Sequence, residues 1–467
     1  MSGQATIDVA EIVERQKLGG FLLGLVAISW IIIFFDGFDS QAIAFAAPYL
    51  SSEYHLDRVM MGNVFSSGLF GTLIGGFLFG YLGDRIGRRP SIIIATAAFG
   101  VLTLAFVFAN GYLSLLALRF VDGIALGGML PLTWALNIEY APKRYRSTIV
   151  TVIMIGYSAG IALGGPTANW LIPQHGWQSL FAVGGALSLL AALVLVLALP
   201  ESARFLASKG LEPRRVADLL RRLTGEPVPD DAHFVVADES GHAKDFDPAL
   251  LFRGRLRVIT PVLWLAYIAS SMAVFFLATW TPLVFEALDF TRSEAALAGS
   301  VNAAAGALGG LLLMRFTDNK GAIAITAMPL VAVPLLLIAA FVGMSQLAFF
   351  SLFALIALFL IGGHFGLHSI AGIFYPSAWR GNGAGWAISV AKLGSIAGPA
   401  LAGVILSTSL PVRNIFAVLA ICPAVFVVCI FAIGRIHSSM LRDEGPKRAL
   451  RPIGRKSRVR RDRLPTA

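Results

Sequence analysis

Charged residues inside long apolar runs are the part of this sequence that could do chemistry. Asp36 and Asp39 interrupt the first run, Arg119 the fourth and Lys392 the eleventh. An ionisable side chain is costly in hydrocarbon, so such residues indicate a functional site. Asp36 and Asp39 share one helix face, where their repulsion in a low dielectric favours protonation. We interpret them as a proton-coupling pair; a structural contact between the first and fourth helices is the alternative.

Arg119 and Lys392 predict the binding of an anion. The planar, permanently charged guanidinium of Arg119 suits a carboxylate. Lys392 lies about ten residues into its helix, near the bilayer midplane, where a lone lysine needs a helix carboxylate or an anionic substrate. Asp122 follows Arg119 by one turn, so a local ion pair is the alternative role of the arginine.

Two histidines and a tryptophan are further candidates for substrate contact. His364 and His368 share a helix face and have no acid or cysteine nearby in the sequence. They therefore favour hydrogen bonding or proton handling over metal binding, and we expect no metal site. Trp134 is one of several aromatic residues in these runs; most such rings pack between helices or face lipid, but one can also stack on a ligand ring.

The connection from Gly80 to Pro90 combines one acid, three arginines and three glycines between two apolar runs. Such a run cannot lie in hydrocarbon, and its positive charge places it on the cytoplasmic side. We predict that it locks the outward-open state, with Asp84 at the N-terminus of the eleventh helix near residues 381–384. Arg85 or Arg89 is expected to reach Glu139. The predicted gate comprises Gly83, Asp84, Arg85, Gly87, Arg88, Arg89, Glu139 and Arg380.

Composition excludes a soluble globular protein, because 57% of the 467 residues are hydrophobic, 14% are charged and the mean hydropathy is +0.76. The net charge of +10 resides in connecting loops and the tail, so membrane topology explains it better than nucleic acid does. Two cysteines imply no disulfide framework. The sequence has no nucleophile–base pair, metal motif or nucleotide loop, so we expect neither an enzyme nor a cofactor other than the coupling proton.

Recurring apolar runs of about 20 residues predict an all-α membrane protein with twelve transmembrane helices in two pseudo-symmetric six-helix halves. Weak repetition supports the division, since the segment from Gly306 to Asp318 echoes that from Gly71 to Asp84. Lys and Arg crowd the loops on one side, which places both termini in the cytoplasm. The expected helices are 20–48, 60–82, 91–109, 112–138, 147–172, 177–199, 257–285, 294–316, 321–342, 346–374, 383–408 and 412–435.

Three polar segments accompany the two halves, 20–199 and 257–435. Residues 1–19 are expected to be a cytoplasmic tail. The central loop, 200–256, contains an amphipathic helix with Pro213 at its start and Gly225 after its end. The basic tail, 436–467, is predicted to be disordered after Gly434 and to contact anionic lipid by charge; a plain topology signal is the alternative.

The pattern Gly-x-Leu-x-Asp-Arg-x-Gly-Arg-Arg at Gly80–Arg89 resembles the signature loop of the major facilitator superfamily. Within it, the chain resembles the aromatic acid:proton symporter family over essentially its whole length. The resemblance rests on Asp36-Gly-Phe-Asp39, Leu118-Arg119-Phe120, Gly127-Gly128, Pro131, Glu139-Tyr140, Pro142, Pro200-Glu-Ser202, Tyr375-Pro376, Arg380, Gly383 and Lys392 to Gly398.

That resemblance implies proton-coupled uptake of a benzoate-like or hydroxybenzoate-like carboxylate by alternating access, across a bacterial inner membrane. It implies transport roles for Asp36, Asp39, Arg119, Arg380 and Lys392. Other interpretations remain open at this point. They are a proton symporter of a non-aromatic organic anion, a proton-coupled drug exporter and, from another class, a transporter-derived sensor.

Overall fold

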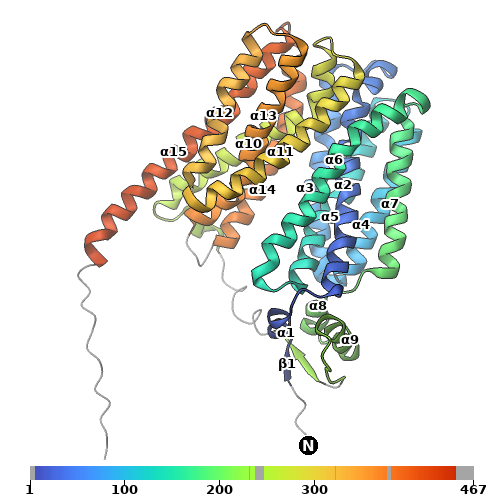
Figure 1. Cartoon of the computed structure of the whole chain (residues 1–467), viewed down its shortest axis with the longest axis vertical. Helices are drawn as coiled ribbons and strands as arrows, with labels where there is room; N and C mark the ends of the chain where they lie inside the picture. The colour runs from blue at the N-terminus through green and yellow to red at the C-terminus, as the bar shows by residue number, and fades with distance from the viewer. Residues whose placement is uncertain (1–5, 231, 237–246, 321, 376–379, 449–467) are drawn as a thin grey trace, which may run out of the picture.

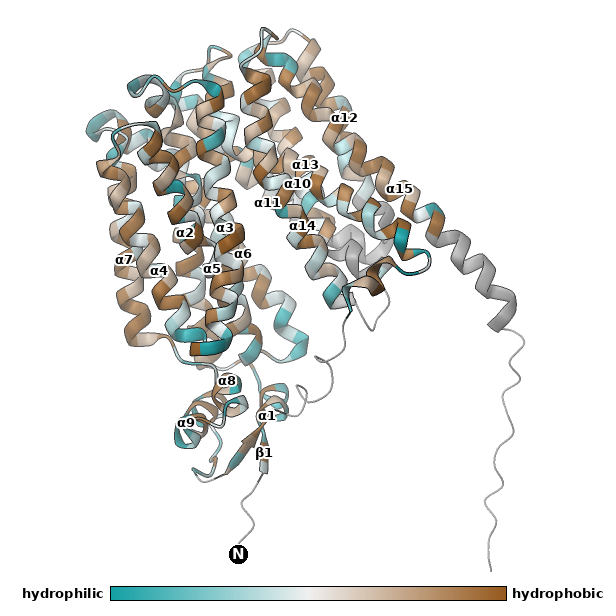
Figure 2. Ribbon diagram, turned by 180° about the vertical axis from the view of Figure 1, so that it is seen from behind, coloured by the Kyte–Doolittle hydropathy of each residue, from teal (hydrophilic) through white to brown (hydrophobic). Residues whose placement is uncertain are grey.

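The computed structural model describes residues 6–230, 232–236, 247–320, 322–375 and 380–448. Twelve long helices in this part of the chain form two bundles of six that lie side by side (Figures 1 and 2). The first half consists of α2 (Gly20–Glu53), α3 (Arg58–Ile86), α4 (Arg88–Ala105), α5 (Tyr112–Tyr140), α6 (Lys143–His175) and α7 (Gln178–Ala198). The second half consists of α10 (Leu256–Glu286), α11 (Arg292–Lys320), α12 (Ala322–Phe341), α13 (Gln346–Phe374), α14 (Arg380–Leu406) and α15 (Ile415–Arg448).

These lengths fit a lipid bilayer, whose ~30 Å hydrocarbon layer takes about 20 helical residues. Within the described residues, eleven helices are long and apolar enough to cross it, and Thr326–Phe341 of α12 is a shorter apolar segment. The predicted fold of twelve transmembrane helices is confirmed. Brown, apolar residues cover the outer faces of both bundles in Figure 2.

The end of α15 differs from the prediction. The helix continues to Arg448, so the expected disorder after Gly434 is wrong as far as that residue. A helix satisfies its backbone hydrogen bonds internally, so a fall in hydropathy alone does not end it. Residues 449–467 of the predicted basic tail lie outside the described residues.

Glycine faces bring pairs of helices into backbone contact. A Cβ on Gly160 of α6 would meet the backbone of Phe34 in α2, and one on Gly394 of α14 would meet the backbone of Ile268 in α10. Small residues permit such close approach where lipid supplies no hydrophobic drive for association. These glycines therefore serve the packing of helix against helix in both halves.

The same helix pairing recurs in both halves. In the first, Gly71 and Gly75 of α3 lie against the backbone of α5; in the second, Gly309 of α11 lies against the backbone of Leu358 in α13. The internal repetition in the sequence therefore corresponds to equivalent close-packed pairs, as expected for a protein built from repeated halves.

The N-terminal segment and the central loop form one small domain, which the sequence did not predict. Strand β1 (Thr6–Asp8) pairs in parallel with β2 (His233–Val235), more than 200 residues later. Helices α1 (Val9–Arg15), α8 (Ala203–Ser208) and α9 (Pro213–Thr224) complete it. Two 3-10 turns, η3 (Pro248–Phe252) and η4 (Val412–Asn414), precede α10 and α15, and η1 (Phe106–Phe108) follows α4.

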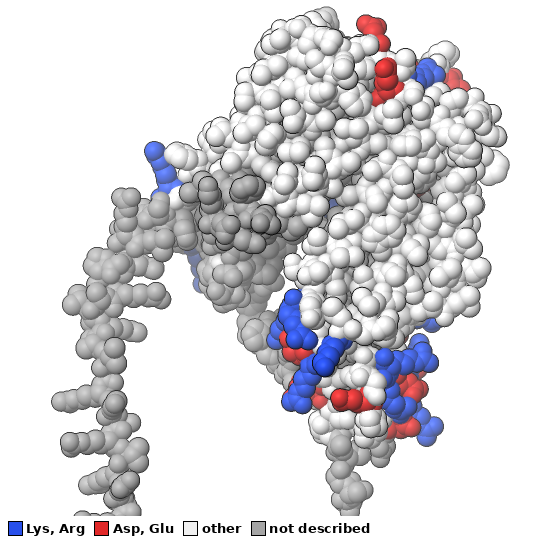
Figure 3. All heavy atoms as spheres, in the orientation of Figure 1, with Lys and Arg blue, Asp and Glu red and all other residues white. Residues whose placement is uncertain are grey.

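Helix α9 is the predicted amphipathic helix, with Pro213 in its first turn and Gly225 in the left-handed conformation after its end. Its apolar stripe is buried against α8, α1, β2 and the start of α2. The small domain is tied to the first half where Arg144 donates to the carbonyl of Gln16 (3.1 Å) and the Tyr140 hydroxyl donates to the carbonyl of Glu201 (2.5 Å). Figure 3 shows Lys and Arg gathered at this end of the molecule.

The two halves meet at the end away from the small domain. There, Gln41 donates to the carbonyl of Ala278 (2.8 Å), and Ser66 donates to that of Ile396 (2.8 Å). Toward the small domain the bundles spread apart (Figures 1 and 2), and Gly80 and Gly385 have open space within 4 Å of where a Cβ would stand. The structure is therefore closed at one end and separated at the other.

Candidate functional site

The buried charges predicted from the sequence gather in the middle of the first half. Asp39 is 1% exposed, and its carboxylate accepts a hydrogen bond from the Thr103 hydroxyl of α4 at 3.3 Å. Gly184 of α7 leaves room for its other oxygen, because a Cβ there would stand 3.1 Å from it. Asp39 therefore faces the interior of the first bundle.

Asp36, one turn earlier, has a charged neighbour in the second half as well as in the first. Its carboxylate interacts electrostatically with Lys392 of α14 and with Asp39 and Arg119. One of its oxygens is buried without a hydrogen-bond partner in the described part of the chain. The two aspartates still interact with each other, but only Asp36 also interacts with a described charge of the second half, that of Lys392.

Arg119 is held by its own half. One guanidinium nitrogen donates to Asp122 at 3.1 Å and another donates to the carbonyl of Ser40 at 2.9 Å. Gly68 of α3 makes room for this side chain, because a Cβ there would stand 2.7 Å from Arg119 Nε. The local ion pair, left open by the sequence, is present, and Asp122 is fully buried.

Lys392 is the cation that the second half brings to this cluster. Its Nζ lies 3.5 Å from the Thr72 hydroxyl of α3, and its charge interacts with Asp36. The lysine is less enclosed than Arg119, since its relative exposure is intermediate. No carboxylate within the described residues accepts a hydrogen bond from the Lys392 ammonium group, so its N–H donors can bind another acceptor.

Two of the remaining predicted contacts, His364 and Trp134, have side chains that the structure describes. His364 Nδ1 lies 2.9 Å from the Ser270 hydroxyl, which joins α13 to α10 within the second half. The side chain of His368 lies outside the described residues, as does that of Arg380. Trp134 is partly buried against the core of the first half, and its indole nitrogen has no hydrogen-bond partner among the described residues.

In the predicted gate, the arginine that reaches Glu139 is Arg88, not Arg85 or Arg89. Arg88 lies 3.1 Å from Glu139 and 2.5 Å from Asp84. Arg85 instead donates to the Tyr81 hydroxyl at 2.5 Å. The chain turns at Gly87 (φ 107°), which starts α4 with Arg88 directed toward the end of α5.

Arg89 and Glu201 fasten the loop to the first half. Arg89 donates to the carbonyls of Leu199 (2.8 Å) and Val196 (2.6 Å) at the end of α7. One oxygen of Glu201 accepts from the backbone N–H groups of Arg88, Arg89 and Ser202 at 2.8–3.1 Å. Sequence reasoning assigned Glu201 no role; the signal was an acid directly after a helix end, near a loop with unsatisfied helix-starting N–H groups.

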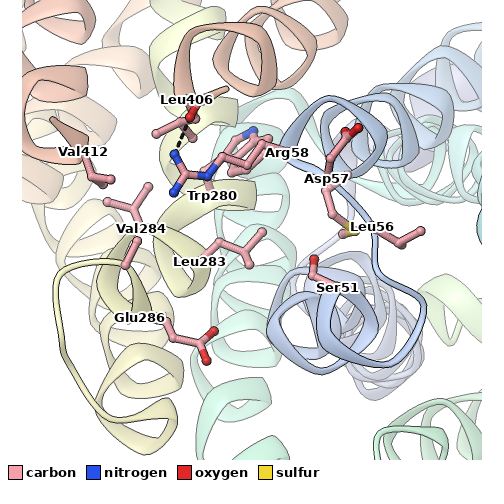
Figure 4. Close-up of a pocket in the computed structure, with 12 residues that line it drawn as sticks. Ser51, Leu56, Asp57, Arg58, Trp280, Leu283, Val284, Glu286, Leu406 and Val412 are labelled. Carbon is pink, nitrogen blue, oxygen red and sulfur yellow. Dashed lines mark hydrogen bonds between the residues drawn. The ribbon is translucent and has the colours of Figure 1, made fainter. Parts of the chain in front are cut away.

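A cavity of about 290 Å³ lies at the closed end, away from the charged cluster (Figure 4). Trp280 and Glu286 of α10 line it with Arg58 of α3 and with Asp57, which caps the start of α3. Arg58 donates to the carbonyl of Leu406 across the halves. Since neither Asp36 nor Lys392 lines it, we assign it to the contact between the halves and not to the charge cluster.

A family model described as Major Facilitator Superfamily matches residues 29–379. The 4-hydroxybenzoate transporter PcaK of Pseudomonas putida is 32% identical over 403 residues, covering 84% of this chain and 88% of that protein. A gallate transporter of Pseudomonas putida is 31% identical over 420 residues, covering 89% and 93%. Among solved structures, a D-xylose-proton symporter has the same fold, with a TM-score of 0.67 at 18% identity over 89% of this chain and 97% of that one.

Proposed function

The chain belongs to the aromatic acid transporters of the major facilitator superfamily, and from this premise we propose that it moves a benzoate-like or hydroxybenzoate-like anion into the cell together with protons. The observation that carries the proposal is the buried charge cluster in which Lys392 of one half faces Asp36 of the other. The names of the relatives, which include 4-hydroxybenzoate and gallate transporters, support an aromatic carboxylate as the substrate.

Lys392 is the proposed binding group for the substrate carboxylate. Its ammonium group comes from the second half while the acids come from the first, so an anion held there draws the halves together. While Asp36 is ionised, it competes with the substrate for Lys392. Protonation of Asp36 removes that competitor and releases the lysine for the substrate, so that the proton and the anion bind together.

Arg119 has a different part in this proposal from the one expected at first. Its guanidinium already contacts Asp122 and the Ser40 carbonyl, and it interacts electrostatically with both Asp36 and Asp39. A change of charge at either aspartate therefore alters the field at Arg119 and at the other aspartate. We assign Asp36 and Asp39 to proton coupling and Arg119 to linking them.

The small-domain end is proposed to be cytoplasmic, because Lys and Arg of short loops mark that side. The structure is then the inward-facing state, with its outer end closed by contacts such as Ser66 to Ile396. In alternating access these contacts would break, and new contacts would form between the two halves at the small-domain end. A bacterial inner membrane is the proposed location, in keeping with the bacterial relatives.

Uptake into proteoliposomes tests the proposal. With an imposed pH gradient, acidic outside, the full chain should accumulate radiolabelled 4-hydroxybenzoate or benzoate, and a protonophore should abolish accumulation. Asp39→Asn should lose gradient-driven accumulation but keep exchange of labelled for unlabelled substrate, since exchange needs no net proton movement. If Asp39→Asn accumulated as much substrate as the unaltered chain, the assignment of proton coupling to α2 would be wrong. Competition only by non-aromatic anions would favour the alternative substrate class.

A further inference from the structure

A second pocket, of about 270 Å³, lies where the small domain meets the first half. We call it the α7–α9 pocket. Helix α7 and the segment after it supply Leu197 and Leu199, α2 supplies Phe21, and three arginines from two separate elements complete the lining: Arg89, Arg215 and Arg222. The substrate proposal does not use this pocket, and Arg89 is the one residue that it shares with the predicted gate.

The three arginines leave positive charge available in the pocket. Arg89 uses two of its five N–H donors on the carbonyls of Leu199 and Val196, which fixes the position of its guanidinium. Arg215 forms an exposed ion pair with Glu212 (3.1 Å), which is worth little in water. Arg222 is exposed and has no ion pair or hydrogen bond from its side chain within the described residues.

The two acids that line the pocket offset only part of this charge. Glu201 is directed at backbone N–H groups, three of which donate to one of its oxygens. Asp218 lies 2.6 Å from Arg221, a fourth arginine that does not line the pocket. The charge of Glu201 remains, but that of Asp218 is offset by Arg221, so the three arginines leave the pocket with a net positive charge that suits an anion.

The pocket also opens onto the surface that faces lipid. Leu197 is 81% exposed in the last turn of α7, a helix that crosses the membrane. Phe21 lies in the first turn of α2. A ligand here meets guanidinium groups on one side and apolar side chains on the other, and a phospholipid has this combination where its phosphate joins its acyl chains.

We infer that the α7–α9 pocket binds the phosphate headgroup of an anionic phospholipid, with the acyl chains lying along Leu197 and the outer face of α7. Arg89 belongs to the first half, whereas Arg215 and Arg222 belong to α9. A lipid phosphate held between them joins the small domain to the bundle from the membrane side. This site is separate from the basic C-terminal tail, and its assignment does not depend on which substrate is transported.

Native mass spectrometry of the purified full chain with dioleoylphosphatidylglycerol tests the inference. Arg222→Gln should weaken lipid binding about fivefold, as expected for the loss of one lysine or arginine contact near anionic lipid. Arg215→Gln combined with Arg222→Gln should weaken it further. Arg214→Gln is the matched control, because Arg214 is exposed on the same helix but does not line the pocket. All variants retain the basic tail, whose contribution therefore cancels.

Thermal unfolding separates a lipid from a free anion and from a folding defect. Phosphatidylglycerol should raise the melting temperature of the unaltered chain more than phosphatidylcholine does, and Arg222→Gln should lose that increment while melting normally without lipid. Leu197→Ser should also retain less phosphatidylglycerol. Equal lipid binding by Arg222→Gln and Arg214→Gln would overturn the inference. Stabilisation by inorganic phosphate equal to that by phosphatidylglycerol would also overturn it, since the pocket would then be an anion site without a lipid.

Discussion

Arg119 is a charged residue whose role depends on the side chains next to it. Asp122 of the same helix and the Ser40 carbonyl of α2 occupy two nitrogens of its guanidinium, which are then not free for a carboxylate ligand. Both members of the pair are nearly or fully buried. Removal of one partner from a buried pair leaves an uncompensated charge, which is strongly destabilising, whereas joint replacement by apolar residues is often neutral.

A double-mutant cycle checks this at the residue scale. Arg119→Met and Asp122→Leu should each lower the stability of the purified protein, by about 3–5 kcal/mol for removing one member of a buried pair. The combined variant should be more stable than either single variant. The measurement is thermal unfolding in one detergent, with transport measured alongside. Additive losses in the double variant would show that the two side chains do not stabilise each other.

Lys392 is the second charged residue whose replacement tests the site, and it interacts with Asp36 of the opposite half. Loss of a charge-assisted hydrogen bond costs about 1.5–3 kcal/mol, or roughly 10–100-fold in affinity. Lys392→Gln should therefore raise the KM for 4-hydroxybenzoate by at least about tenfold, and Lys392→Arg should recover part of it. Thr72→Val should change the KM less, because its hydroxyl lies at the long distance of 3.5 Å. An unchanged KM in Lys392→Gln would place the substrate carboxylate elsewhere.

At the scale of elements, glycines decide which helices can touch. Along α2 and α6, Gly37 and Gly160 bring two backbones together, and a Cβ on either would meet backbone atoms that have no freedom to move aside. These contacts hold the helix that carries Asp36 and Asp39 at one depth and rotation. The position of both aspartates therefore depends on Gly37 of α2 and Gly160 of α6.

Gly160→Val should consequently destabilise the protein, by about 1–3 kcal/mol or more, as extra volume does in a packed core. It should also lower transport, because α2 must shift. Gly24→Ala is the control in α2, since a Cβ there meets nothing within 4 Å. That change should be neutral or slightly stabilising, because alanine has less backbone freedom to lose than glycine in a helix. Similar melting temperatures for Gly160→Val and the unaltered chain would contradict the packing argument.

For the whole molecule, the register between α3 and α14 indicates which residues would meet in the outward-open state. The helices run antiparallel: Gly62 meets Pro399, Ser66 meets Ile396 and Thr72 meets Lys392. Each step along α3 thus corresponds to an equal step back along α14. Continued toward the small domain, the same register sets Gly80 opposite Ala384 and Asp84 opposite Arg380, at the N-terminus of α14. The gate contact of Asp84 predicted from the sequence follows this register, and it stays a prediction for the outward-open state.

Cysteine crosslinking tests that closure. In a background with Cys422→Ser and Cys429→Ser, Gly80→Cys with Ala384→Cys should form a disulfide only when the small-domain ends come together. Arg58→Ala removes a contact across the closed end and should increase the yield. Gly80→Cys with Leu393→Cys is the control, since Leu393 is exposed and lies about two and a half turns from the expected register position. Equal yields from both pairs, or no response to Arg58→Ala, would refute closure in this register.

The sequence alone determined which segments cross the membrane, how many there are and which residues within them are chemically unusual. These features are local: twenty apolar residues satisfy their own backbone in a helix, and Asp36, Arg119 or Lys392 stands out against them wherever its neighbours lie. Loop charge likewise reports sidedness without any knowledge of packing.

Only the tertiary structure decided which of these residues meet. The surroundings of Asp39 depend on Thr103 and Gly184, which other helices supply. The choice of Arg88 for Glu139 depends on the turn at Gly87 and on the end of α5. Strand β1 finds β2 across more than 200 residues, a pairing to which a three-residue strand contributes almost no local signal. Each of these contacts joins segments far apart in the chain, so its energy depends on the packing of the whole bundle and not on the residues of one segment.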